Sequence, residues 1–497
     1  MLGSVTSATL IGVDGHVVTV EVHIGGGLPG YSVVGLPDAA VRESRERVRA
    51  ALANSGFAWP SQRVTVNLAP GGLRKTGAGF EVAVALGIAL ANEQLPAGVL
   101  DRVGVLGELG LDGSVRPVPG TLALVDVLAR AGMASVVVPA ANAAEAALVR
   151  GVRIRPATHL GSLRACLEGQ DDWPDPPAPP AEPEPADDGV DLAEVRGLTW
   201  ARRALETAAA GAHHLLLTGP PGAGKTMLAR RLPTILPPLD HHEALEVTRI
   251  HSAAGHPPVH GLLRERPFRA PHHTASTAAL VGGGSRRPGP GEVTLAHRGA
   301  LFLDELGEFP PHALEAMRQP LEDRVVRISR QPFTITFPAD FQLVACSNPC
   351  PCGLGPPRCT CSDLQRARYR RRLSAPLLDR FDLRLDVRPP EPDAPPGESS
   401  AVVRERVAAA VARQEARYAN RPWRRNAHIP AGALGRMVPL DADAADAWRE
   451  RIEERSLTGR GAARIRRVAR TLADLDDSAS VSATHVTLAS MLREDVP

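Results

Sequence analysis

The octapeptide GPPGAGKT at residues 219–226 has the residue types and spacing of a loop that cradles nucleotide phosphates. It follows the apolar run Leu215–Leu217 and precedes a segment of helical character, which is the order that such a loop requires. Its glycines allow backbone N–H groups to face the phosphates, while the ammonium group of Lys225 reaches the β and γ oxygens and the hydroxyl of Thr226 meets magnesium. We therefore expect ATP with Mg²⁺ to contact Gly219, Pro220, Pro221, Gly222, Ala223, Gly224, Lys225 and Thr226.

Lysine usage supports this interpretation of the loop. Of the 57 Lys and Arg residues in the chain, only Lys75 and Lys225 are lysines. A guanidinium fork is too wide for a phosphate loop, whereas a compact ammonium group fits. A lysine therefore stands where an arginine would not serve.

A second apolar run, Leu301–Leu303, ends in the carboxylates of Asp304 and Glu305. In a parallel sheet the carboxyl ends of the strands share one edge, so both carboxylates should lie beside the phosphate loop. We expect Asp304 to bind magnesium and Glu305 to orient and polarise the attacking water. The alternative is a helix N-terminus enriched in acidic residues. Another apolar run, 341–346, delivers Asn348 to the same edge, where its amide could sense the γ-phosphate.

The elements that position these groups fall into three domains. The Pro-rich, acidic segment 169–190 cannot bury a core and is expected to be a linker. Before it, residues 1–168 alternate β-rich and helical runs, which predicts a compact α/β domain. Residues 191–390 carry apolar strand candidates between helices, as in a parallel sheet with a phosphate loop. Residues 391–497 show helical patterns and predict a small helical domain.

Composition sets the broad class. Hydrophobic residues make up 43% of the chain, and the longest apolar stretch, 82–91, is too short to span a bilayer. No lysine or arginine precedes Arg42, so we expect no signal peptide, no membrane contact and a cytoplasmic location. The net charge of +2 excludes no partner, because arginine clusters are offset by acidic stretches. An aromatic content of 3% argues against extensive base stacking.

These residues resemble the AAA+ ATPases and, within them, the magnesium-chelatase-like family that includes ComM and YifB proteins. The resemblance covers nearly the whole chain. Besides GPPGAGKT it is carried by FRAPHHTAS at 268–276, AHRGALFLDEL at 296–306, SNPCPCG at 347–353 and SAPLLDRFD at 374–382. One departure is Leu198, where the family usually has Gln, which leaves contacts to the base near residues 195–198 open.

The resemblance implies roles for three further residues. Asn348 would be the first sensor, Arg380 an arginine finger that reaches the nucleotide of a neighbouring subunit, and Arg460 the second sensor on a C-terminal lid. A finger acting in trans requires a ring, which in this family is a hexamer. As alternatives, Arg380 could pair with an aspartate of its own chain, at position 379 or 382, and Arg464 could replace Arg460 one helical turn on.

The first 168 residues resemble the proteolytic domain of Lon-type ATPases. The segments KTGAG at 75–79 and GELGLDG at 107–113 stand at the Lon active-site segments. Gly77 occupies the position of the nucleophilic serine and Leu122 that of the general-base lysine. Because acyl transfer needs both groups, we expect a noncatalytic platform for subunit packing or DNA rather than a protease. Lys75 could contact a phosphate there or lie on the surface.

Four of the six cysteines form two pairs, Cys350-Pro-Cys352 and Cys359-Thr-Cys361. In a cytosolic chain this pattern favours a metal over disulfides, and four thiolates could hold one tetrahedral structural Zn²⁺. Free thiols and a redox pair are the alternatives. Between the first sensor and the finger, the cluster could brace a loop near the subunit interface. The adjacent His272 and His273 are not expected to form a metal pair, because neighbouring side chains diverge on an extended chain.

Residues 322–335 alternate polar and apolar side chains like a β-hairpin. In related DNA motors such hairpins point into a central channel, where Arg324, Arg327 and Arg330 could meet phosphates. A solvated charged face is the alternative. The preceding segment 248–296 holds further arginines at positions 264, 266, 269, 286 and 287.

The resemblance favours an ATP-driven hexameric DNA motor, a helicase that promotes branch migration in recombination and in the uptake of transforming DNA. Its partners would be single-stranded or branched DNA and recombination proteins. The main alternative is an ATPase that drives magnesium insertion into a porphyrin, and the motif DDSAS at 476–480 matches integrin-like metal sites. Only 17 residues follow that motif, so we interpret it as a loop. A protease is disfavoured by Gly77 and Leu122, and an ATP-binding adaptor by Glu305 and Arg380.

Overall fold

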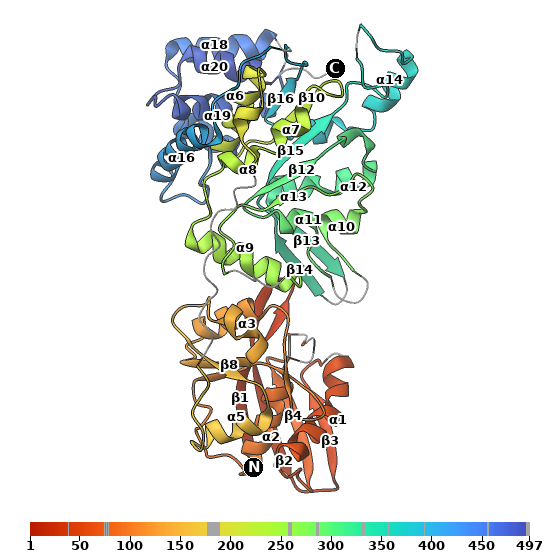
Figure 1. The fold of residues 1–497 in the computed structure, drawn as a ribbon, viewed down its shortest axis with the longest axis vertical. Helices are drawn as coiled ribbons and strands as arrows, with labels where there is room; N and C mark the ends of the chain where they lie inside the picture. Colours follow the sequence, from red (N-terminus) through yellow and green to blue (C-terminus); the bar gives the residue numbers. More distant parts are fainter. Residues whose placement is uncertain are drawn as a thin grey trace. The chain divides into compact units, whose positions relative to one another are not determined.

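The fold divides into two compact units (Figure 1), which we describe separately. The first unit comprises Met1–Pro185 and His242–Leu263, and the second comprises Ala186–His241 and Arg264–Pro497. This computed structural model describes residues 1–37, 39–73, 75, 77, 79–175, 189–256, 261–284, 288–330, 333–355, 357–391, 393–454 and 457–493. Most of the expected linker 169–190 therefore lies outside the described residues, as do Arg286 and Arg287.

The first unit is built on a seven-stranded mixed sheet with the order β3-β4-β2-β1-β5-β8-β9. The strands are β1 (Leu2–Ile11), β2 (Asp14–Gly25), β3 (Gly30–Val34), β4 (Arg63–Ala69), β5 (Val103–Val105), β8 (Ser135–Pro139) and β9 (Arg153–Ala157). Short strands β6 (Glu108–Leu109) and β7 (Val115–Arg116) pair separately. The helices are α1 (Ala39–Asn54), α2 (Glu81–Ala91), α3 (Thr121–Arg130), α4 (Ala143–Ala146) and α5 (Leu160–Leu167).

Alternation along the strands gives this sheet a core on each face. On β8, Val137 packs into one apolar cluster, while Val136 and Val138 pack into the other. This follows from the two-residue period of a strand. Helix α2, whose sequence EVAVALGIALA is apolar on nearly every side, is buried in the first cluster. The α/β character expected for the residues before the linker is present in this unit.

One helix of the first unit comes from far along the chain. Helix α9 (His241–Ala253) follows the phosphate-loop region in sequence, yet residues 242–263 belong to the first unit. The Ser252 hydroxyl donates to the buried carboxylate of Glu145. Arg249 lies 3.2 Å from Asp14 and 3.5 Å from Asp126. The sequence-based division placed this helix in the ATPase core, 191–390; these partners account for its different position.

The second unit contains a five-stranded parallel sheet with the order β11-β12-β15-β10-β16. Its strands are β10 (Leu215–Thr218), β11 (Phe268–Arg269), β12 (Ala300–Leu303), β15 (Gln342–Ser347) and β16 (Leu383–Asp386). The parallel sheet predicted from the apolar runs is confirmed. Strands β13 (Val325–Arg330) and β14 (Phe333–Pro338) form the predicted hairpin, which lies at the end of the unit opposite α14 (Figure 1).

Helices surround the sheet and continue into the C-terminal part. Around the sheet lie α6 (Thr199–Gly211), α7 (Lys225–Ala229), α8 (Leu232–Ile235), α10 (Thr277–Val281), α11 (Glu292–Leu295), α12 (Pro311–Ala316), α13 (Arg318–Asp323), α14 (Asp363–Arg370) and α15 (Ala375–Leu378). The C-terminal helices are α16 (Ser400–Arg417), α17 (Leu434–Met437), α18 (Ala442–Glu454), α19 (Gly459–Leu475) and α20 (Ala483–Met491). A single apolar cluster includes Leu217 of the sheet together with Val407 and Val468 of the C-terminal helices. In the described part of the chain, no helix is both long and apolar enough to cross a membrane.

Candidate nucleotide-binding site

The phosphate loop connects the end of β10 at Thr218 to the start of α7 at Lys225. Gly222 and Gly224 have φ values of 77° and 86°, a backbone region that glycine adopts without strain. Gly219 passes close to β16, because a Cβ there would lie 2.2 Å from the carbonyl oxygen of Val387. The sequence thus places glycine where the chain turns left-handed or passes another backbone.

Lys225 lies with its ammonium group inside the loop. Its Nζ donates to the carbonyl oxygens of Gly219 at 2.6 Å and Pro220 at 2.8 Å. The Asn348 Oδ1 atom lies 3.5 Å from the same nitrogen. Burial lowers the pKa of Lys225 from its usual value. The loop therefore presents the positive charge of Lys225 next to the side-chain amide of Asn348, which follows β15.

Thr226 and Asp304 meet across the sheet edge. The Thr226 hydroxyl donates to Oδ2 of Asp304 at 3.0 Å, and the Glu305 N–H donates to Oδ1 at 3.0 Å. A hydroxyl and a carboxylate side by side are oxygen ligands of the kind that Mg²⁺ prefers. The two residues predicted to bind magnesium are therefore brought together.

Glu305 adopts a strained backbone. Its φ is 52°, in the left-handed region that a non-glycine residue rarely occupies, and such strain is often found at functional sites. Its carboxylate lies 3.2 Å from Nδ1 of His273. This pair was not predicted from the sequence, in which the FRAPHHTAS motif is the only signal that precedes it.

The expectation for the two histidines is wrong in one respect. The rings of His272 and His273 do not diverge but lie 4.1 Å apart between centroids. The chain turns at residues 273–274 rather than running extended, which explains the approach. His272 contacts its own loop, with Nδ1 lying 2.9 Å from the Thr274 hydroxyl.

Arg380 is held by its own subunit. Its Nη2 lies 2.5 Å from Glu322 Oε2, its Nε donates to the Arg318 carbonyl at 3.1 Å and its Nη1 donates to the Pro376 carbonyl at 2.7 Å. The alternative pairing with Asp379 or Asp382 is wrong, because Asp379 pairs with Arg493 and Asp382 with Arg464.

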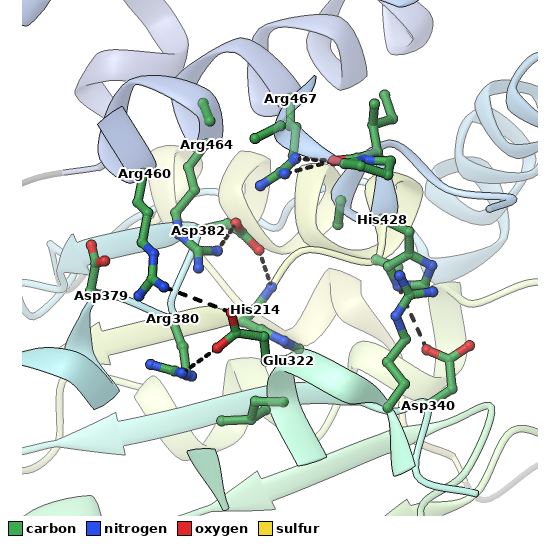
Figure 2. Close-up of a pocket in the computed structure, with 18 of the residues that line it drawn as sticks. His214, Glu322, Asp340, Asp379, Arg380, Asp382, His428, Arg460, Arg464 and Arg467 are labelled. Atoms are coloured by element: carbon green, nitrogen blue, oxygen red, sulfur yellow. Dashed lines mark hydrogen bonds and ion pairs between the residues drawn. The ribbon is translucent and has the colours of Figure 1, made fainter. Parts of the chain in front are cut away.

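Arg380 and Arg460 converge on one cavity of about 480 Å³. Figure 2 shows both guanidinium groups directed toward Glu322, and Arg460 Nη2 lies 3.8 Å from Oε1 of that residue. The cavity lining includes Arg324, Arg464 and Arg467 but no residue of the phosphate loop. These arginines therefore gather away from the nucleotide loop of their own chain.

Arg464 is already committed to a buried ion pair with Asp382, whose carboxylate also accepts the His214 N–H at 3.0 Å. Burial alone would raise the pKa of Asp382, but the Arg464 guanidinium and His213 hold it well below its usual value. Arg460, by contrast, has a side chain that is 65% exposed. The structure thus leaves Arg460 the more available of the two.

We expect Arg464→Ala to lower the free energy of unfolding by about 3–5 kcal/mol, because it strands a buried carboxylate. Arg460→Ala is the matched control one helical turn away. It should lower the free energy of unfolding by no more than about 1 kcal/mol, because its ion pair with Glu322, at 3.8 Å, is exposed. Urea unfolding followed by circular dichroism compares the two variants. Equal losses would contradict the structural role of Arg464.

Comparison with known proteins decides the family. A family model described as magnesium chelatase, subunit ChlI, matches residues 191–394. Models described as subunit ChlI of Mg-chelatase and as the ChlI C-terminal part match residues 20–142 and 397–493. An uncharacterised protein of Mycobacterium tuberculosis is 45% identical over 99% of both chains. YifB of Escherichia coli, itself uncharacterised, and the competence protein ComM of Haemophilus influenzae are 41% and 40% identical, each over 98% of this chain and 96% of the relative.

The chain belongs to the magnesium-chelatase-like family that includes YifB and ComM. This membership makes it an AAA+ ATPase by class, with ATP and Mg²⁺ as the matching cofactors. The grouping of Lys225, Thr226 and Asp304 agrees with that class.

A weaker, partial similarity links the chain to a Lon protease. Lon protease 2 of Bacillus subtilis is 28% identical over 179 residues, which is 30% of this chain and 31% of that protein. Leu122, which we expected at the position of the general-base lysine, is fully buried, and its N–H donates to Glu145 at 3.0 Å. Lys75 is also fully buried and donates to the Pro70 carbonyl, so the alternative that it lies on the surface is wrong. Its backbone forms a β-bridge with Pro37.

The four clustered cysteines are brought together as predicted. All are free thiols, and one ligand sulfur from each lies within 4.8 Å of the others. The Sγ atom of Cys352 lies 3.2 Å from that of Cys350 and 3.8 Å from that of Cys359. Backbone N–H groups of Leu354 and Thr360 lower the pKa of Cys352 to about 5. These sulfur atoms could hold one metal ion.

The hairpin β13–β14 presents fewer free arginines than expected. Arg327 is 52% exposed and lies 3.0 Å from Asp323. Arg324 lines the cavity that Arg380 and Arg460 share, and its left-handed backbone, with φ of 57°, lies between α13 and the hairpin. The side chain of Arg330 lies outside the described residues.

Proposed function

We propose that this chain is the subunit of a hexameric, ATP-hydrolysing ring that moves on DNA. The observation that carries the ATPase part is the grouping of Lys225, Thr226, Asp304 and Asn348 at the carboxyl edge of one parallel sheet. ATP with Mg²⁺ supplies the transferable phosphoryl group and its counter-ion when bound. The Thr226 hydroxyl and the Asp304 carboxylate would hold the ion.

Each remaining group acts on the charge or the water of the hydrolysis step. The ammonium group of Lys225 stabilises negative charge at the loop mouth, and the amide of Asn348 senses the terminal phosphate. The Glu305 carboxylate orients and polarises the attacking water. His273, 3.2 Å from that carboxylate, fixes where it points.

The requirement for a ring follows from the arginines. Arg380 and Arg460 share Glu322 and line a cavity that contains no phosphate-loop residue. A guanidinium group stabilises the transferring phosphoryl group only by direct approach. In this proposal both arginines act on the nucleotide of a neighbouring subunit, so hydrolysis requires assembly.

The DNA part rests on the likeness to the competence protein ComM and on the hairpin β13–β14. Each subunit of a ring would contribute one hairpin, so the exposed Arg327 would recur once per subunit around the ring. Repetition concentrates positive charge that the net charge of a single chain hides. We propose branch migration during homologous recombination and natural transformation as the activity, with recombination proteins as partners.

ATP turnover with and without DNA tests this function. We expect single-stranded and branched DNA to stimulate turnover, more strongly for branches, and the stimulation to fall as salt rises, because contacts to phosphates release counter-ions. Lys225→Ala provides the blank, and an unbranched duplex provides the control DNA. Turnover that is indifferent to all three DNA forms would contradict the DNA motor.

A second candidate is an ATPase that drives magnesium insertion into a porphyrin. It is favoured by the three family models, all of which describe the magnesium chelatase subunit ChlI. DNA-independent turnover that responds to a porphyrin-binding partner would support this candidate instead. The same assay therefore separates the two.

A further inference from the structure

We propose that Cys350, Cys352, Cys359 and Cys361 bind a single zinc ion, and that this ion holds the loop between β15 and α14 against the phosphate loop. The zinc would thereby control how well the site holds nucleotide. The second part rests on the proposed ATPase function, whereas the zinc site does not.

The sulfur geometry fits a tetrahedral ion. Thiolates bound to zinc at about 2.3 Å in a tetrahedron lie about 3.8 Å from one another. The Sγ atom of Cys359 lies 3.5 Å from that of Cys350 and 3.8 Å from that of Cys352. A disulfide needs sulfur atoms about 2.05 Å apart, which none of these thiols approaches. The Cys352 N–H donates to Cys361 Sγ at 3.3 Å, a contact that orients a thiolate ligand.

The loop has little other internal support. In the described part of residues 349–361, the backbone hydrogen bonds between N–H and carbonyl groups amount to one, from Gly353 to Cys350 at 2.9 Å. No helix or strand lies within the residues of this loop that the structure describes. A zinc ion bound by cysteines at both ends of such a loop would hold it in one conformation, which its few backbone hydrogen bonds do not do.

This loop is in contact with the nucleotide site at two points. Gly353 passes Pro221 of the phosphate loop so closely that a Cβ at Gly353 would lie 3.0 Å from Cδ of the proline. Asn348, two residues before the first cysteine, lies 3.5 Å from the Lys225 ammonium group. The cysteine loop therefore supports both the phosphate loop and the amide that faces it.

The helix after the cysteines reaches the other side of the same site. The ring of Tyr369 on α14 lies against Gly307, where a Cβ would lie 2.5 Å from the tyrosine hydroxyl. Gly307 is two residues from Glu305. The segment that begins at Asn348 and ends at Tyr369 thus contacts the site on two sides. A bound metal would hold these two contacts at a fixed separation.

Metal analysis of the full-length protein tests the zinc site. We expect about one zinc per chain by plasma mass spectrometry, lost in the double variant Cys350→Ser/Cys352→Ser. Cys166→Ser is the matched control, since Cys166 is a free cysteine in the first unit. Wild-type protein purified without zinc, or with iron in its place, would overturn the site.

Binding of a fluorescent ATP analogue with Mg²⁺ tests the coupling. We expect zinc removal from the wild type to weaken binding at least fivefold and zinc re-addition to restore it. Unchanged affinity after zinc removal would overturn the coupling. A wild type that holds zinc yet binds no nucleotide would overturn the coupling and the proposed function while leaving the zinc site standing.

Two glycine variants test the contact while all four cysteines stay in place. We expect Gly353→Ala to weaken nucleotide binding at least fivefold with zinc retained, because its new Cβ would press on Pro221. Gly355→Ala is the control: its φ of 64° is also left-handed, but its Cβ would meet Pro349 of its own loop. Equal effects of the two substitutions would overturn the role of the Pro221 contact.

Discussion

Arg380→Ala is expected to lower ATP turnover by about 10³-fold or more while leaving ATP affinity nearly unchanged. The guanidinium group stabilises charge on the transferring phosphoryl group, which develops in the transition state and is weaker in bound ATP. In the structure this group lies 2.5 Å from Glu322 and lines a cavity apart from the phosphate loop of its own chain. Turnover and analogue binding measured on the same preparation separate the two effects. Arg372→Ala, which breaks only the exposed pair with Glu308, is the matched control.

Mixing variants shows whether Arg380 acts in trans. Lys225→Ala removes the ammonium group from the loop but keeps the finger, whereas Arg380→Ala keeps the loop and removes the finger. If the finger serves a neighbour, mixed rings contain intact loops facing intact fingers, and turnover reappears on mixing. If gel filtration shows that mixed rings form and the mixture is still as inactive as each variant alone, Arg380 acts on the nucleotide of its own chain.

Residue patterns predicted the scaffold of the second unit well. The apolar runs at 215–217, 301–303 and 341–346 became β10, β12 and β15, because buried parallel strands need little besides a short apolar run between helices. The groups at their carboxyl ends then came together, since parallel strands share that edge. Local sequence was sufficient to predict where a side chain lies whenever that side chain directly follows a strand.

Residues whose environment depends on distant segments were predicted poorly. The backbone of Lys75 pairs with Pro37, and Ser252 of α9 contacts Glu145 in the first unit, so both environments depend on residues far away in the sequence. The same applies to Arg380, whose partner is Glu322 on α13 rather than a neighbour in sequence. A periodic pattern specifies which face of an element is buried, but it does not specify what lies opposite.

Glu322 lies between two arginines of the second unit. Its two carboxylate oxygens face Arg380 and Arg460, which come from different elements of the second unit. If the phosphate of a neighbouring nucleotide attracts the guanidinium group of Arg380 or of Arg460, the Glu322 carboxylate keeps only the remaining arginine as its partner. The positions of Arg380 and Arg460 are therefore coupled through one side chain in this arrangement.

Glu305→Gln is expected to retain ATP binding and to lower turnover by about 10²- to 10⁴-fold. The amide keeps the size of the side chain but loses the charge that polarises the attacking water. The loop, Thr226 and Asp304 are untouched, so affinity for the analogue should stay within about twofold. The backbone of Glu305 already holds a left-handed φ of 52°, which the substitution does not relieve. The variant therefore reports on the carboxylate and not on the fold.

Glu308→Gln is the matched control for this prediction. Glu308 follows three residues later on the same segment, and its carboxylate lies 3.0 Å from Arg372 in an exposed ion pair. Such a pair contributes little, so turnover should stay close to that of the wild type. Near-normal turnover in Glu305→Gln would remove Glu305 from the water-orienting role, and His273, its 3.2 Å partner, would become the next group to substitute. A loss of analogue binding in Glu305→Gln would instead show that the carboxylate holds the nucleotide rather than the water.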